Sequence, residues 1–218
     1  MSTKLKFALS ALALAAAAGA NAADINSESD VSLTGATLYD FEAGPSGTFA
    51  THSFGSLTVT ALAGVNTPAP LFSVDGDYAG SYNTRGQLHI TNHGDEFQSL
   101  RFDFGAQTSA FGFLFGASDS TWTLSAFNAG NVNVGSRSIS ATSSSNAGDF
   151  FGLSGLTGAT YATLTQVQDG AYNGGGVDYV FVDNMRVAAV PEPETYAMLL
   201  AGLGVMGAVA RRRRARAG

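Results

Sequence analysis

Residues 99–116 read SLRFDFGAQTSAFGFLFG, and this stretch decides the fold. In its first and last thirds, every second residue is a large apolar one. The alternating apolar positions are Leu100, Phe102, Phe104, Phe111, Phe113 and Phe115. Because successive side chains of a strand point to opposite faces, a period of two indicates strands with one buried face. The pattern predicts two strands, Gln98–Phe104 and Thr108–Phe115.

Short runs of the same kind continue on both sides of this stretch, separated by Gly, Pro, Asn and Ser. The other predicted strands are Ala36–Glu42, Ser56–Leu62, Gln87–Thr91, Thr121–Phe127, Val132–Ser140, Phe150–Leu153, Tyr161–Val167 and Val177–Val187. No segment of residues 23–187 has a convincing helical period. About ten short strands predict an all-β domain, an antiparallel two-sheet β-sandwich of jelly-roll type.

The composition limits the classes of function. The chain has no cysteine, which excludes disulfides and thiolate metal sites. Between Ala23 and Ala189, fifteen acidic residues and four arginines give a formal charge of −11 with neutral histidines. So acidic a domain argues against nucleic acid as a partner and is compatible with Ca²⁺ or neutral polysaccharide.

The first 22 residues predict a secretory signal peptide. Lys4 and Lys6 precede an apolar run, Phe7–Ala18, and Ala20-Asn21-Ala22 supplies the small-x-small cleavage pattern. Without a twin-arginine pair, we expect export by the general secretory (Sec) route and a mature chain that starts near Ala23.

The C-terminal segment, 188–218, has three parts in a fixed order: a Pro-Glu-Pro motif within 190–194, an apolar run at 195–210 and a basic tail at 211–218. The apolar run predicts a single transmembrane helix. At roughly 1.5 Å per residue it spans about 23 Å, which is short of a hydrocarbon core of roughly 30 Å. Basic residues after the run favour a cytoplasmic C-terminus. The residues that define the motif and the stop-transfer block are Val190, Pro191, Glu192, Pro193, Arg211, Arg212, Arg213 and Arg214.

This segment closely resembles the PEP-CTERM sorting signal of Gram-negative bacteria. The resemblance implies that exosortase, an integral-membrane protease-transpeptidase, processes the tail. The protein would pause in the inner membrane and then reach the cell surface or the extracellular, exopolysaccharide matrix of a biofilm. The alternative is a permanent membrane anchor, for which a Pro-Glu-Pro motif is not needed.

The β-rich part is similar in layout to the sandwich domain ahead of many PEP-CTERM tails and to jelly-roll carbohydrate-binding modules. The motifs that carry this resemblance are LYDFE, FDFGAQTSAFGFLFG, FFGLSG and VDYVFVDNMRV. The resemblance implies a non-catalytic domain for adhesion, matrix structure or glycan binding. A glycosidase or lyase on the same scaffold stays open, although no catalytic motif is present.

Two groups of residues are candidate binding sites. If the first and last strands are neighbours, their acidic residues would converge on a structural Ca²⁺, which prefers several oxygen ligands; the alternative is a set of solvated acids. This group is Asp40, Glu42, Asp178 and Asp183. The second group, Tyr78, Tyr82 and Tyr172, lies in polar, Gly- and Asn-containing stretches and would offer exposed rings to a sugar.

Overall fold

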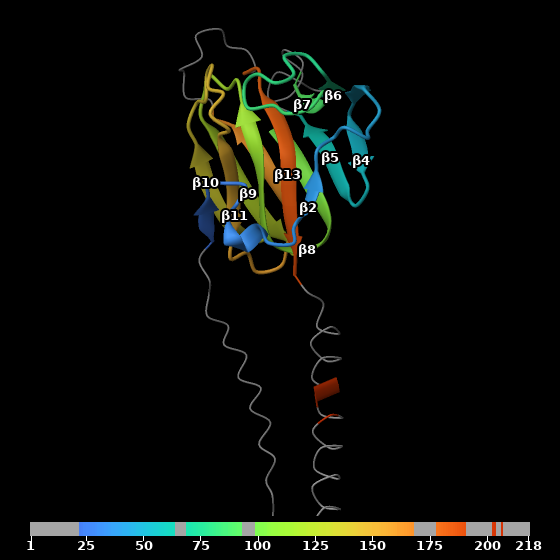
Figure 1. The fold of residues 1–218 in the computed structure, drawn as a ribbon, viewed down its shortest axis with the longest axis vertical. Helices are drawn as coiled ribbons and strands as arrows, with labels where there is room; N and C mark the ends of the chain where they lie inside the picture. The colour runs from blue at the N-terminus through green and yellow to red at the C-terminus, as the bar shows by residue number, and fades with distance from the viewer. Residues whose placement is uncertain are drawn as a thin grey trace, which may run out of the picture.

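The computed structural model describes residues 22–63, 69–92, 99–167 and 178–190, together with Gly202, Leu203 and Met206 (Figure 1). The described chain forms thirteen strands and one short 3₁₀-helix, η1 (Val31–Leu33). The strands are β1 (Ala23–Ile25), β2 (Thr37–Tyr39), β3 (Gly47–Phe49), β4 (Thr51–Phe54), β5 (Leu57–Leu62), β6 (Phe72–Asp75), β7 (His89–Thr91), β8 (Ser99–Gly116), β9 (Trp122–Asn128), β10 (Asn133–Ile139), β11 (Phe150–Ser154), β12 (Ala159–Gln166) and β13 (Phe181–Ala189). The all-β, antiparallel prediction is therefore confirmed.

Strand β8 is one continuous strand of 18 residues where two were predicted. It bends near Gly105, which has a φ of 64°, a conformation that costs glycine little. Beyond the bend the strand doubles back over itself. The rings of Phe104 and Phe111 lie 4.9 Å apart, and those of Phe102 and Phe113 lie 5.8 Å apart. The two halves of β8 thus face each other with their phenylalanines between them.

The two halves of β8 pair with different strands. The first half pairs with β12 and β5, and the second half pairs with β11 and β13. Strands β9 and β10 extend the sheet beyond β12, whereas β2 and β7 pair with β13. All thirteen strands therefore belong to one open, hydrogen-bonded sheet. This corrects the prediction of two separate sheets, because a glycine bend lets one strand continue where a loop was expected.

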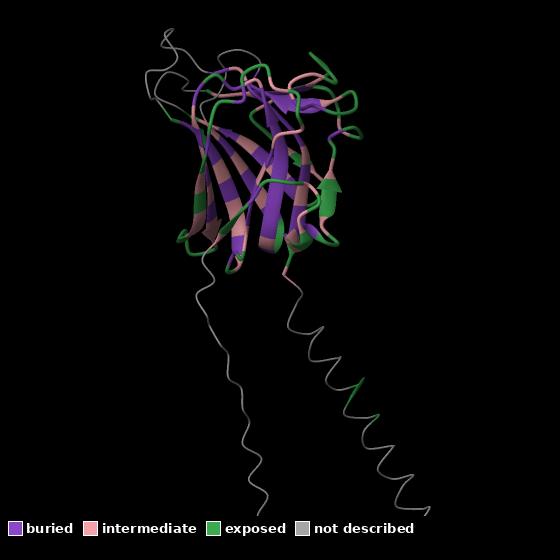
Figure 2. Ribbon diagram, turned by 60° about the vertical axis from the view of Figure 1, so that its left-hand side comes forward, coloured by how far each residue is buried: buried purple, intermediate pink, exposed green. Residues whose placement is uncertain are grey.

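The core fills the space between the facing halves of the sheet. Burial alternates along the strands, as in β5, and Figure 2 shows this as purple and pink bands. Fully burying one phenylalanine contributes roughly 1.5–3 kcal/mol, so these side chains provide much of the stability of a chain that has no disulfide. The largest fully buried side chains include Phe72, Phe102, Phe111, Phe113, Phe115, Trp122 and Phe181.

Four strands were not predicted from the sequence: β1, β3, β4 and β6. Each is only three or four residues long, too short to display a clear period of two. The last strand starts at Phe181 and not at Val177, because Asp178 belongs to a buried loop that is described below.

The chain enters β1 and leaves β13 at the same end of the domain (Figure 1). Beyond the last strand, the Val190 N–H donates to the Gln107 carbonyl over 2.7 Å. The predicted signal peptide and sorting motif lie outside the described residues, apart from Ala22 and Val190. Of the predicted transmembrane stretch, the described residues Gly202, Leu203 and Met206 are helical. Within the described part of the chain, no helix has both the length and the apolar character needed to cross a membrane.

Candidate ligand-binding site

A pocket lies among the loops between β6 and β7, β8 and β9, and β10 and β11, together with the residues directly before β13. Its volume is about 280 Å³. Three tyrosines form its apolar surface, and a carboxylate and two hydroxyls add polar groups. The lining residues are Tyr78, Tyr82, Ala117, Asp119, Ser143, Ser144 and Tyr179. We call this the tyrosine pocket.

The tyrosine rings stand at steep angles to one another. Tyr78 meets Tyr82 at 5.7 Å and 80°, and it meets Tyr179 at 6.4 Å and 76°. Phe181 supports this group from β13, because its ring stacks on Tyr82 at 5.8 Å and an angle of 29°. Tyr78 is 59% exposed, so its ring is available to a ligand.

The loops around the tyrosine pocket contain unusual backbone conformations. Eight described residues other than glycine have a positive φ, and five of them line or adjoin the pocket. Such conformations are uncommon for residues with a Cβ and persist where the surrounding structure holds them, often at functional sites. The five are Tyr78 (61°), Tyr82 (52°), Asn83 (66°), Ala117 (63°) and Ser143 (47°).

Asn83 ties the tyrosine loop to the loop before β11. Its side-chain amide donates to the Phe115 carbonyl and to Asp149 Oδ2, each over 2.9 Å. In return, the Gly148 N–H donates to Asn83 Oδ1 over 2.7 Å. The Asn83 N–H donates to Asn146 Oδ1 over 2.9 Å. Because Asn83 is buried, these bonds hold the neighbouring Tyr82 in place.

A second set of bonds fixes the serine side of the pocket. The Ser118 N–H donates to Thr142 Oγ1 over 3.1 Å, and the Thr142 N–H donates to Ser118 Oγ over 3.0 Å. The Ser143 N–H then donates to the Ser118 carbonyl over 2.7 Å. The loops that carry Asp119 and Ser143 are therefore joined, and the pocket is formed before any ligand arrives.

Asp178 lies under the floor of this site and does not join the other predicted Ca²⁺ ligands. Its carboxyl oxygens accept the Asp119 N–H at 2.8 and 3.0 Å and the Ser120 hydroxyl at 2.9 Å. They also accept the Trp122 Nε1–H at 2.9 Å. Asp178 is 1% exposed, and its oxygens are occupied by groups of the protein. Asp178 thus positions Asp119 through these bonds, and its role as a calcium ligand stays a prediction.

The three remaining acidic residues of that prediction are neighbours. Glu42 Oε1 accepts the N–H groups of Gln87 and Leu88 over 2.7 and 2.9 Å. Asp183 accepts the N–H groups of Arg85 and Asn184 over 2.5 and 2.6 Å. The pKa of Asp183 is raised to about 7, mainly because the carboxyl group is buried; the charges of Glu42 and Asp40 also raise this pKa, and the two hydrogen bonds lower it.

Nowhere in the described part of the chain do three His, Asp or Glu side chains come together in a way that would hold a metal ion. Calcium binding by Asp40, Glu42, Asp178 and Asp183 therefore stays a prediction. The sequence placed Asp178 and Asp183 on one strand, whereas β13 begins only at Phe181 and the two carboxyl groups have different partners.

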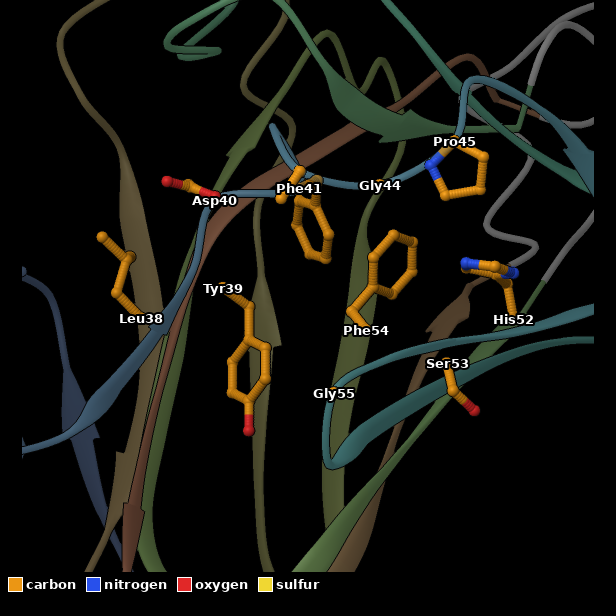
Figure 3. Close-up of a pocket in the computed structure, with 11 residues that line it drawn as sticks. Leu38, Tyr39, Asp40, Phe41, Gly44, Pro45, His52, Ser53, Phe54 and Gly55 are labelled. Atoms are coloured by element: carbon orange, nitrogen blue, oxygen red, sulfur yellow. The ribbon is translucent and has the colours of Figure 1, made fainter.

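Figure 3 shows a second hollow, of about 370 Å³, between β2 and the hairpin of β4 and β5. Both β2 and β4 are edge strands that pair on one side only. Phe41 and Phe54 meet edge to face at 4.9 Å, and Tyr39 Oη lies 2.7 Å from Ser56 Oγ. These contacts bridge the open edges of the sheet, so we explain this hollow by the packing of the two edges against each other.

Two of the three predicted sugar-binding tyrosines, Tyr78 and Tyr82, meet in the tyrosine pocket, and Tyr172 lies outside the described residues. Sequence reasoning missed Tyr179 and Asp119 as members. Tyr179 lay within the predicted strand Val177–Val187, and Asp119 lay between two predicted strands. Trp122 is fully buried in the core and does not line the pocket.

Comparison with known proteins bears on the C-terminal segment. The PEP-CTERM protein-sorting motif matches residues 189–214. Exosortase recognises this motif, so the chain has the sorting signal of an exported protein of the cell surface or extracellular space. No curated protein matches the chain.

Proposed function

We propose that this protein is a non-catalytic, glycan-binding protein of the cell surface or exopolysaccharide matrix, and that its ligand is a sugar held in the tyrosine pocket. The proposal rests on one observation: three tyrosines line the same pocket. The loops that carry them have unusual backbone conformations and are held by hydrogen bonds. Aromatic rings supply flat apolar surface for the C–H face of a sugar, and their hydroxyls remain available for hydrogen bonds.

The position of the pocket relative to the tail supports this proposal. Strand β13 runs from Phe181, under the tyrosines, to Ala189, directly before the sorting motif. At roughly 3.3 Å per residue, these ends are about 26 Å apart. A protein held by its C-terminal segment would thus present the pocket outward, toward the surrounding polysaccharide.

The proposed route follows from the two ends of the chain. The protein crosses the inner membrane by the Sec pathway, pauses there by its apolar C-terminal run and is released when exosortase cleaves near Pro191-Glu192-Pro193. The sorting motif at 189–214 supports the exosortase step. The tail is then a substrate for another enzyme and takes no part in binding the glycan.

A binding role fits the polar groups of the pocket better than hydrolysis does. Glycosidases generally use two carboxyl groups on either side of the scissile bond. Asp119 is the single carboxylate among the described lining residues.

Glycan-array and calorimetric measurements on the mature protein test the proposal. We expect binding to a polysaccharide of the cell envelope or matrix, and a loss of at least about tenfold in affinity for Tyr78→Ala and Tyr82→Ala. Tyr161→Ala is the matched control, because its ring stacks on Phe127 at 5.0 Å, away from the pocket. Loss of binding in Tyr39→Ala alone would place the ligand in the second hollow and overturn the proposal.

A further inference from the structure

We propose that the sugar in the tyrosine pocket carries a positive charge, as the ammonium group of a deacetylated hexosamine does. This inference rests on the proposed glycan-binding function and names the chemical class of its ligand. The pocket would hold the ammonium group between the faces of the tyrosines and the carboxylate of Asp119.

The ring geometry suits a cation. The face of an aromatic ring is electrostatically negative and attracts an ammonium group that lies within about 6 Å of the ring centre. Tyr78 stands nearly perpendicular to both Tyr82 and Tyr179. Because all three tyrosines line the same pocket, one small cation held there would contact more than one ring.

Asp119 adds a full negative charge to this pocket. The residue is exposed and lines the pocket beside the tyrosines. Its backbone is fixed by the two hydrogen bonds from its N–H to Asp178. No basic side chain is among the lining residues that the structure describes, so a ligand cation would meet no like charge there.

The rest of the domain strengthens the attraction. Residues 23–189 contain fifteen acidic residues and four arginines. Each of these arginines already contacts an acidic side chain: Arg85 and Arg186 contact Glu28, Arg101 contacts Asp103 and Arg137 contacts Asp24. The unbalanced negative charge raises the local concentration of cationic ligands and disfavours anionic polysaccharides.

The test compares two ligands that differ in one group. A fully deacetylated oligomer of β-1,4-linked glucosamine and its N-acetylated counterpart are titrated into the mature protein at a pH where the free amines are protonated. We expect the deacetylated oligomer to bind at least about tenfold more tightly, with an affinity that falls as salt is added. Asp119→Asn should remove this preference, so that the two oligomers bind with similar affinity.

The variants separate charge from shape. Tyr78→Phe keeps the ring and should keep the preference, whereas Tyr78→Leu removes the aromatic face and should lose it. Because Asp119 and Tyr78 are exposed, both positions tolerate substitution, and the fluorescence of Trp122 reports whether each variant is folded.

Three other outcomes would overturn this inference. Equal binding of both oligomers would overturn the cationic ligand and leave glycan binding intact. If no glycan binds to the wild-type protein or to the tyrosine variants, both proposals fail. Equally tight binding of a lysine hexapeptide at this pocket would show that the ligand is a cationic peptide, which would also overturn this inference.

Discussion

Gly116, at the end of β8, lies directly against the backbone of Tyr82: a Cβ built on Gly116 would overlap the Tyr82 carbonyl oxygen. The end of the central strand therefore supports the loop that carries the tyrosine pocket. Any side chain at position 116 would have to push this loop away from β8.

Substitution of Gly116 should damage the pocket and the fold together. We expect Gly116→Ala to lower the free energy of unfolding by about 1–3 kcal/mol, as overpacking typically does, and to weaken glycan binding at least about tenfold. Urea denaturation and calorimetry measure the two effects. Gly130→Ala is the control, since its Cβ would meet nothing closer than 3.3 Å. A stable Gly116→Ala variant with full affinity would contradict the close approach.

Asp178 should be the acid whose loss costs most stability. Asn in its place offers one acceptor oxygen where Asp offers two, so its NH₂ group would face at least one of these buried donors and leave it without an acceptor. We expect Asp178→Asn to lower the free energy of unfolding by roughly 2–4 kcal/mol, measured by urea denaturation. The fluorescence of Trp122, the single tryptophan, should change as well. The exposed Asp24→Asn should change stability by less than about 0.5 kcal/mol.

The buried Asp183 should make stability depend on pH. Its folded pKa of about 7 lies above the ordinary value of 3.8, so the folded state binds the proton more tightly than the unfolded state does. The resulting stabilisation is fully present below pH 3.8 and is lost as pH rises toward and through 7.

Asp183→Asn should remove this dependence, because the amide stays neutral at every pH. We expect the wild type to lose stability between pH 4 and pH 8 relative to the variant, measured by thermal melting across that range. Parallel curves for the two proteins would show that Asp183 titrates normally.

The sorting motif should control the mass of the mature protein. In a host that contains exosortase, we expect the released protein to lack Arg211–Arg214, as shown by intact-mass spectrometry. Substituting Pro191 and Pro193 with Ala should leave the uncleaved form in the membrane fraction, whereas Pro45→Ala in the domain should not. A released wild-type protein that still carries the arginines would refute tail processing.

The sequence determined the features that depend on neighbouring residues. Alternation in the 99–116 stretch predicted buried strands, because the period of two is a local property of the backbone. The tail was recognised in the same way, since its motif, apolar run and arginines follow one another along the chain.

Only the tertiary structure decided which distant residues meet. Nothing local indicates that Tyr78 and Tyr179 line one pocket, because hydrogen bonds between separate loops bring them together. The pocket also contains positive φ values at Tyr78, Tyr82 and Ser143, which these residue types do not favour on their own. For the same reason, Asp178 and Asp183 looked equivalent in the sequence, yet one anchors a loop beneath the pocket and the other is a buried group near Glu42 with a raised pKa.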